Sequence, residues 1–139
     1  GADENTCNAL EVFGYELGLA YQAVDDVLGI WGDPKITGKP AGNDLREKKK
    51  SMPVSIVLSA NNSDSEKLLE IFSTTEDLDE EEIVKASALI ENAGGREATL
   101  EEADEHLKRA IEFLNNADIR KETFCELEEI AHFVVNRDS

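Results

Sequence analysis

The chain has 139 residues, 40% of them hydrophobic, which is enough for one soluble domain, or part of one, with a core of its own. Thirty-one Asp and Glu residues against fourteen Lys and Arg give a formal net charge of −17, so nucleic acid and anionic membranes are excluded as nonspecific partners. No apolar run approaches the length of a transmembrane segment, and Cys7 and Cys125 have no neighbouring residues at metal-ligand spacing. We therefore expect a cytoplasmic protein with reduced cysteines.

Apolar residues recur at helical spacing from the start of the chain. One stripe predicts a long first helix, and its members are Leu10, Phe13, Leu17, Tyr21, Val24 and Leu28. Gly14 and Gly18 lie one turn apart on this helix, and each should cost about 1 kcal/mol relative to Ala unless a neighbouring helix packs closely. The helix ends at three helix breakers, Gly29, Gly32 and Pro34. The Gly- and Pro-rich residues 33–43 then predict a loop.

Helical patterns also dominate the rest of the chain. Five further helices are predicted, over residues 52–60, 63–72, 79–92, 99–114 and 118–135. Pro53 suits a first helical turn, and Thr99 followed by Glu102 predicts a capping box at the start of its helix. No strand pattern competes with these helices. We therefore expect an all-α chain of five or six helices in antiparallel packing.

An acid pair, Asp25 and Asp26, interrupts the apolar stripe of the first helix. Gln22 and Asp26 share a helix face, and Tyr21 continues the stripe, so the acids emerge at the edge of a packed surface. In a helix bundle this is where side chains reach an interior cavity. An acid pair at a helix end is most often simply solvated, but here a basic, Gly-rich loop follows at once. Because Mg²⁺ takes one or two protein carboxylates together with water and phosphate oxygens, the pattern indicates a site for a divalent cation and a polyphosphate.

The segment after the first helix supplies further candidates. Asp33 either continues the acidic face or caps the next turn, and Lys39 is either exposed or held at a fixed point by its Gly and Pro neighbours. Asp44 either caps the following segment or pairs with Lys48. Of the lysines at 48–50, we expect one or two to face phosphate and the rest to face water.

Other chemistries find little support in the sequence. His106 and His132 stand singly on helices, where a surface or packing role is the more common one. No Ser/His/Asp or Cys/His arrangement for a nucleophile is present, and no Gly-rich loop lies between a strand and a helix.

Two stretches carry a family resemblance: YQAVDDVLGIWGD at 21–33 and TGKPAGNDLREKKKSMPV at 37–54. They resemble the second aspartate-rich region of the trans-isoprenyl diphosphate synthases, or polyprenyl synthetases. That region reads aromatic–Gln–x–x–Asp–Asp–x–x–Asp, then Gly–Asp, then a Gly–Lys loop leading to Asp–Leu and a further Lys. The segments FGYELGLA at 13–20, GGREATLEEADEHLKRAIEFL at 94–114 and EIAHFVVNR at 129–137 are similar to neighbouring parts of the same family. The resemblance implies the isoprenoid synthase-type helical bundle.

The chain departs from the family pattern in two places. The third Asp of the motif falls on Gly29, so its share of metal binding is missing or passes to Asp33. The family's first aspartate-rich motif, with its accompanying arginines, is absent. We therefore expect residues 1–139 to be the C-terminal part of a single polyprenyl synthetase domain.

The resemblance also implies roles for individual residues. The residues implied to hold Mg²⁺ are Asp25, Asp26 and, more weakly, Asp33. Those implied to bind substrate are Tyr21, Gln22, Lys39, Asp44 and Lys49, with the two lysines on the leaving diphosphate and Asp44 steadying the loop. The implied catalytic residues are Asp25, Asp26 and Lys39.

The implied activity is an Mg²⁺-dependent prenyltransferase of the geranylgeranyl or farnesyl type. It condenses isopentenyl diphosphate with an allylic diphosphate, and the complete enzyme is expected to be a homodimer. Without the missing N-terminal half, this chain alone should be inactive. Two alternatives stay open: a terpene cyclase on the same fold, and a non-catalytic subunit or helical interaction domain.

Overall fold

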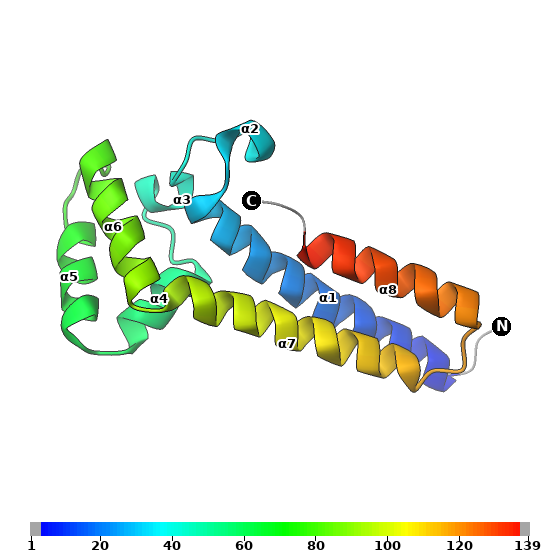
Figure 1. Ribbon diagram of the computed structural model, residues 1–139. Helices are drawn as coiled ribbons and strands as arrows, with labels where there is room; N and C mark the ends of the chain where they lie inside the picture. Colours follow the sequence, from blue (N-terminus) through cyan, green and yellow to red (C-terminus); the bar gives the residue numbers. More distant parts are fainter. Residues whose placement is uncertain (1–3, 137–139) are drawn as a thin grey trace. The chain divides into compact units, whose positions relative to one another are not determined.

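The computed structural model describes residues 4–136, and these residues contain helices and no strands. Six helices have eight residues or more: α1 (Glu4–Trp31), α4 (Met52–Ser59), α5 (Ser63–Phe72), α6 (Glu80–Asn92), α7 (Gly95–Asn115) and α8 (Lys121–Val135) (Figure 1). Two single-turn helices, α2 (Pro34–Thr37) and α3 (Asn43–Arg46), fall where the sequence predicts a loop or its end. The all-α prediction is confirmed. Over the part that the structure describes, no helix has the length and apolar character needed to cross a bilayer.

The chain forms two compact units, each considered by itself. The three-helix unit contains residues 4–24 and 101–136, from α1, α7 and α8. These three helices lie side by side, with α1 drawn between α7 and α8 and with α8 running antiparallel to α7 (Figure 1). Their apolar faces form one core, whose buried members are Phe13, Leu107, Ala110, Leu114 and Ala131. The predicted stripe on the first helix supplies Phe13 and Leu17 to this core. Leu10 and Tyr21 of the same stripe are exposed, so packing among the described residues explains only part of its periodicity.

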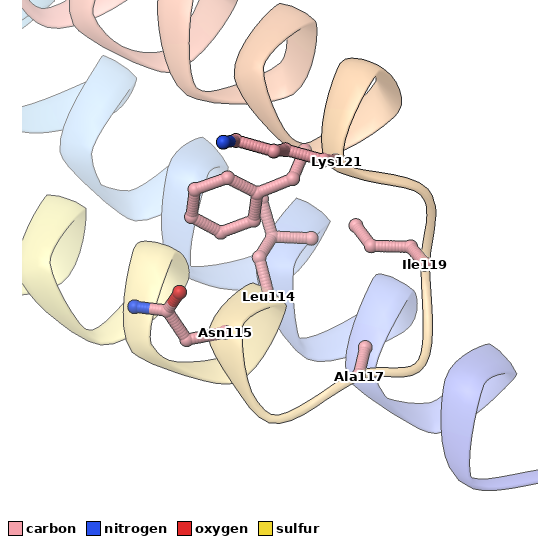
Figure 2. A pocket seen from close by; sticks show the side chains of 6 residues that line it. Leu114, Asn115, Ala117, Ile119 and Lys121 are labelled. Atoms are coloured by element: carbon pink, nitrogen blue, oxygen red, sulfur yellow. The ribbon is translucent and has the colours of Figure 1, made fainter.

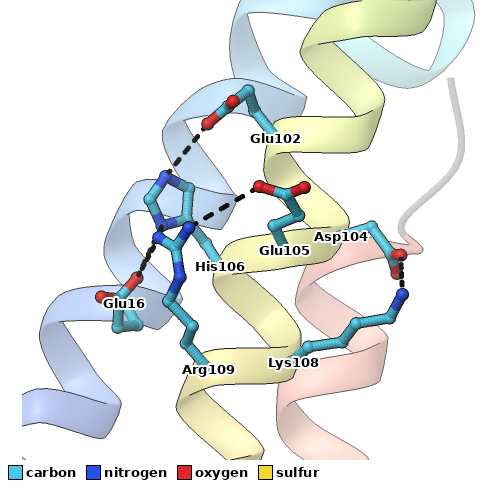
Figure 3. Close-up of polar contacts among 7 residues, drawn as sticks. All are labelled: Glu16, Glu102, Asp104, Glu105, His106, Lys108 and Arg109. Carbon is cyan, nitrogen blue, oxygen red and sulfur yellow. Dashed lines mark hydrogen bonds and ion pairs between the residues drawn. The ribbon is translucent and has the colours of Figure 1, made fainter.

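A polar cluster joins α1 and α7 within the three-helix unit (Figure 3). Nδ1 of His106 lies 2.6 Å from Oε2 of Glu16, and both side chains are largely buried. Arg109 lies between Glu16, at 3.9 Å, and Glu105, at 3.6 Å. The packing role predicted for His106 is therefore what the structure describes.

The loop-bearing unit contains residues 25–100, from the end of α1 to the start of α7. Its core gathers the inner faces of α4, α5 and α6 with residues from the neighbouring segments: Ile30, Leu45, Val54, Val57, Leu68, Leu78, Ile83, Ala86 and Ile90. Capping boxes start two of these helices, Asn62 with Ser65 at α5 and Asp79 with Glu82 at α6. Leu45 is completely buried, so α3 is anchored in the core immediately beside Asp44.

The predicted start of α7 is wrong. The helix begins at Gly95, and Thr99 lies inside it as a fully buried residue whose Oγ1 donates a 2.7 Å hydrogen bond to the Gly95 carbonyl. Thr99 therefore bonds backwards along the helix instead of capping it. The turn between α6 and α7 uses two glycines for different reasons: Gly94 has φ +88°, and a Cβ on Gly95 would lie 2.8 Å from the carbonyl oxygen of Pro53.

Gly42 offers a direct test of packing in the loop-bearing unit. It has φ +71°, and a Cβ added there would lie 2.5 Å from Cγ2 of Ile83. Gly42→Ala should lower the free energy of unfolding by about 2–4 kcal/mol, from backbone strain and overpacking together. Gly38→Ala is the matched control, because Gly38 has φ +74° but no atom within 4 Å of the added Cβ. In urea unfolding, equal losses in the two variants would show that Ile83 does not crowd position 42.

Candidate metal and diphosphate site

Asp26 lies near the end of α1, where its carboxylate contacts the start of α4 and the loop before it. It is 6% exposed, and Oδ2 accepts a 2.9 Å hydrogen bond from the backbone N–H of Met52, the first residue of α4. The N-cap residue of α4, Ser51, makes no capping bond with its own side chain. Asp26 therefore caps α4 from another helix, where the helix dipole also favours a negative charge.

Lys49 places a cation between two carboxylates. Its Nζ lies 3.5 Å from Oδ1 of Asp26 and 3.6 Å from Oδ2 of Asp44. Burial lowers the pKa of Lys49, but attraction to Asp44 and Asp26 and hydrogen bonds to both outweigh it, so the net pKa is raised. The ammonium therefore stays protonated through the physiological pH range.

The basic residues near Lys49, Lys48 and Arg46, contact other segments of the loop-bearing unit. Lys48 has φ +55°, and its Nζ donates to the carbonyl of Thr74 and to Oγ1 of the same residue at 3.2 Å. Arg46 forms an ion pair with Glu80, the first residue of α6. The sequence alternative that pairs Asp44 with Lys48 is therefore wrong, because Lys48 is tied to the segment between α5 and α6.

Asp44 lies against the end of α1. It is 8% exposed, and its Oδ2 occupies space only 2.0 Å from where a Cβ on Gly29 would be. The structure therefore brings together three charged side chains from three segments: Asp26 from α1, Asp44 from α3, and Lys49 from the loop before α4.

The remaining predicted site residues are placed as follows. Asp25 is half-buried on α1, one position before Asp26. Asp33 is exposed at the N-cap of α2, where its Oδ1 accepts a 2.9 Å hydrogen bond from the N–H of Lys35. Lys39 is exposed in the loop between α2 and α3. Tyr21 and Gln22 are exposed residues of α1 in the three-helix unit.

The carboxylates near Lys49 suit a metal ion whose remaining ligands are phosphate oxygens. Among residues 4–136, no three His, Cys, Asp or Glu side chains converge as a metal-binding group. The largely buried carboxylates of Asp26 and Asp44 nevertheless share the Lys49 ammonium, so a positive charge already lies between them. Mg²⁺ commonly uses one or two protein carboxylates together with water and substrate phosphates, so the residues present fit that ion.

A separate depression lies at the turn between α7 and α8 in the three-helix unit (Figure 2). Its volume is about 240 Å³, and it is lined by Leu114, Asn115, Ala117, Ile119, Lys121 and Phe124. None of the predicted site residues lines it, and it contains no acid. Its chemistry therefore does not suit a metal ion.

Comparison with known proteins identifies the family of the chain. Residues 1–90 match the family model described as polyprenyl synthetase. This match covers more than half of the chain. The chain belongs to the polyprenyl synthetase family.

Individual relatives place the chain within the polyprenyl synthetases. It is 42% identical over 116 residues to a geranylgeranyl diphosphate synthase from Mycobacterium tuberculosis, covering 84% of this chain and 33% of the relative. It is 47% identical to a crystal structure of a polyprenyl synthetase from Streptomyces coelicolor A3(2), with a TM-score of 0.91, covering 97% of this chain and 42% of the other.

A geranylgeranyl pyrophosphate synthase from Corynebacterium glutamicum, determined in complex with isoprenyl diphosphate and magnesium, is 26% identical with a TM-score of 0.84. The match covers 97% of this chain and 38% of that one. The chain therefore spans about two fifths or less of the length of the polyprenyl synthetases that it matches.

Two parts of the site were not predicted from the sequence. The first is the backbone N–H of Met52, which no side-chain pattern marks as the partner of Asp26. The second is Gly29, whose missing side chain makes room for Asp44. A glycine one turn after an acid pair inside an otherwise apolar helix is a signal for such a close approach.

Proposed function

We propose that this chain carries the second metal and diphosphate site of a prenyltransferase that condenses isopentenyl diphosphate with an allylic diphosphate. The main support is the Lys49 ammonium, held 3.5 Å from Asp26 and 3.6 Å from Asp44 beside the acid pair. A lysine between fixed acids is well placed to move onto a phosphate oxygen when a divalent cation takes over those acids. Membership of the polyprenyl synthetases supports the same reaction class.

Mg²⁺ is the proposed cofactor. The Corynebacterium relative was determined with magnesium and isoprenyl diphosphate, and the carboxylates near Lys49 suit that ion. Asp25 and Asp26 are the proposed ligands, directly or through water, and Asp33 is a weaker candidate. When bound, Mg²⁺ would neutralise the charge of the departing diphosphate.

The residues of this chain have distinct proposed tasks. Lys49 and Lys39 contact the diphosphate, so that its negative charge is stabilised as the carbon–oxygen bond of the allylic substrate breaks. The double bond of isopentenyl diphosphate then attacks the allylic carbocation, and loss of a proton completes the condensation. Asp44 holds the loop that carries Lys49, and Tyr21 and Gln22 line the reacting centre.

The complete activity is proposed for a protein that also contains the first aspartate-rich motif. The relatives are more than twice as long as this chain, so this chain alone is expected to bind diphosphate without turning it over. A cytoplasmic homodimer is the proposed working form. The terpene cyclase alternative is not favoured by the relatives, and a non-catalytic subunit is distinguished from the enzyme by the binding test that follows.

Lys49 should have opposite effects on two binding reactions. In Lys49→Met, Asp26 and Asp44 lose their internal cation, so Mg²⁺ alone should bind about three- to tenfold more tightly, as expected for a partly exposed ion pair. Inorganic pyrophosphate in the presence of Mg²⁺ should bind about tenfold more weakly, because one phosphate contact is lost. Isothermal titration calorimetry on this chain measures both affinities.

The neighbouring lysine provides the control for this experiment. Lys50→Met removes the same charge one residue away, from an exposed side chain, and should leave both affinities within about twofold. Absence of Mg²⁺-dependent pyrophosphate binding in the unmodified chain would contradict the proposed function and favour a non-catalytic helical partner. Equal weakening in both variants would show only a general charge effect.

A further inference from the structure

Ser51 precedes α4 with a buried hydroxyl that makes no hydrogen bond. The residue is 2% exposed, and its Oγ has no hydrogen-bond partner among the residues that the structure describes. A hydroxyl that loses its bonds to water on folding and gains none in the protein lowers stability. Serine at this position is therefore unfavourable unless the hydroxyl is used in another state of the molecule.

The backbone of Ser51 already has the conformation of a helix N-cap. Its φ of −72° and ψ of 170° lie in the extended region typical of N-cap residues, and its carbonyl accepts a 2.9 Å hydrogen bond from the N–H of Ser55. An N-cap side chain accepts from the second or third residue of its helix. The second residue of α4 is Pro53, which has no N–H, so the N–H of Val54 is the available donor. A rotation of the Ser51 side chain about its Cα–Cβ bond is the change that a normal cap requires.

Asp26 takes the place of that cap in the structure. Its Oδ2 accepts the N–H of Met52 at 2.9 Å, and its Oδ1 lies 3.5 Å from the Lys49 ammonium. The negative charge also interacts favourably with the dipole of α4, so the Ser51 hydroxyl gains little by turning towards Val54. A divalent cation that binds Asp26 would draw on the same charge and the same oxygen atoms. The start of α4 would then lose part of its cap.

We propose that Ser51 is a reserve cap for α4, which replaces Asp26 when that carboxylate turns to a divalent cation. This inference rests on the proposed function and extends it to the cost of cation binding. The Ser51 hydroxyl accepts the N–H of Val54, so the start of α4 stays capped while Asp26 holds the cation. Ser51 is thus a positioning residue, since it acts through α4 and Asp26 and touches neither the cation nor the substrate.

A double-mutant cycle of Asp26→Ala and Ser51→Ala tests the reserve cap in this chain without any ligand. Urea unfolding gives the equilibrium constant for folding of the four proteins. Ser51→Ala alone should change this constant by no more than about twofold, because no hydrogen bond is lost. In the Asp26→Ala background, the same change should lower the constant about five- to tenfold, the usual scale for loss of an N-cap.

Ser65→Ala is the matched control, because Ser65 is another buried serine of the loop-bearing unit. It is also 2% exposed, but its Oγ donates a 2.6 Å hydrogen bond to the carbonyl of Val57. Its replacement should lower the folding constant by the same factor with and without Asp26→Ala, since the two sites share no partner. An additive loss at Ser65 beside a coupled loss at Ser51 distinguishes a reserve cap from a general weakening of the unit.

Amide hydrogen exchange and calorimetry report whether the change occurs when a cation binds. With Mg²⁺ and inorganic pyrophosphate, exchange of the Val54 N–H should slow about tenfold in the unmodified chain and in Ser65→Ala, but not in Ser51→Ala. The affinity for pyrophosphate in the presence of Mg²⁺ should be about three- to tenfold lower in Ser51→Ala, because the start of α4 is left without a cap.

The proposal is overturned if Ser51→Ala has the same effect on folding with and without Asp26→Ala. It is also overturned if pyrophosphate binds but neither its affinity nor the exchange of the Val54 N–H depends on Ser51. If the unmodified chain binds no pyrophosphate with Mg²⁺, the proposed function itself fails, while the urea cycle still decides whether Ser51 can replace Asp26 as the cap. If Asp26→Ala does not fold, exchange of the Val54 N–H with and without Mg²⁺ and pyrophosphate decides.

Discussion

Asp25→Ala, introduced into a protein that contains both aspartate-rich motifs, should lower kcat/KM by about 10²- to 10³-fold, which is typical for removal of one group that stabilises charge in the transition state. The reason is that Asp25 is proposed to hold the cation against the departing diphosphate. Steady-state turnover with isopentenyl diphosphate and an allylic diphosphate at saturating Mg²⁺ measures this effect. Undiminished turnover under these conditions would contradict the assignment of Asp25.

The control for Asp25→Ala uses another acid of the same helix. Glu11 is exposed on α1 in the three-helix unit, and Glu11→Ala removes the same charge far along the sequence from the acid pair. Its turnover should stay within about twofold of the unmodified protein, since isolated surface charges are strongly screened. A far-UV circular dichroism spectrum of each variant separates loss of chemistry from loss of fold.

The helices of this chain could be predicted because each buries one apolar face. The stripe that contains Phe13 and Leu17 predicts α1, and the structure places both side chains in the core of the three-helix unit. The helix predicted over residues 79–92 is confirmed as α6, and the structure adds a capping box there, in which Asp79 and Glu82 lie three residues apart and bond reciprocally. A capping box predicted from Thr99 was wrong, because the Thr99 hydroxyl bonds back to Gly95 inside a helix that has already begun. A short polar motif does not show whether its residues will be buried.

The sequence indicates which charged residues the structure brings together, but it does not indicate which atoms they contact. Asp26 and Lys49 stand out in the sequence as an acid within an apolar helix and a lysine in a basic run. Their contact, however, depends on Lys48 adopting a left-handed backbone conformation, which is uncommon for a residue other than glycine. The partner of Asp26 at α4 is a backbone N–H, and every residue type except proline carries one. Contacts of this kind follow from the tertiary structure, and no residue pattern specifies them.

Gly29 shows how a departure from a motif can be explained by structure. In the sequence it stands where the family pattern has a third Asp, and that residue's share of metal binding is either missing or passes to Asp33. In the structure, an Asp at this position would collide with Asp44. In this chain, glycine at position 29 and the observed position of the Asp44 carboxylate therefore go together.

Asp26→Ala should destabilise the chain, in contrast to the largely chemical effect expected at Asp25. The change removes the cap of α4 and leaves the N–H of Met52 without its partner, at a cost of about 2–3 kcal/mol in the free energy of unfolding. The ion pair with Lys49 adds little to this figure, since that ammonium is 44% exposed and screened by solvent. Equilibrium unfolding in urea measures the loss.

Asp26→Asn separates the two roles of this residue. The amide oxygen keeps an acceptor for the N–H of Met52, so the loss of stability should shrink to about 1 kcal/mol, the scale of a single charge-assisted contact. Binding of Mg²⁺ should still weaken, because the carboxylate charge is gone. Equal stability of the Ala and Asn variants would show that capping of α4 does not depend on Asp26. If Asp26→Ala is less stable than Asp26→Asn, a loss of activity on substitution of Asp26 combines damage to the fold with damage to the cation site. Asp25 is then the residue at which the chemistry is tested separately.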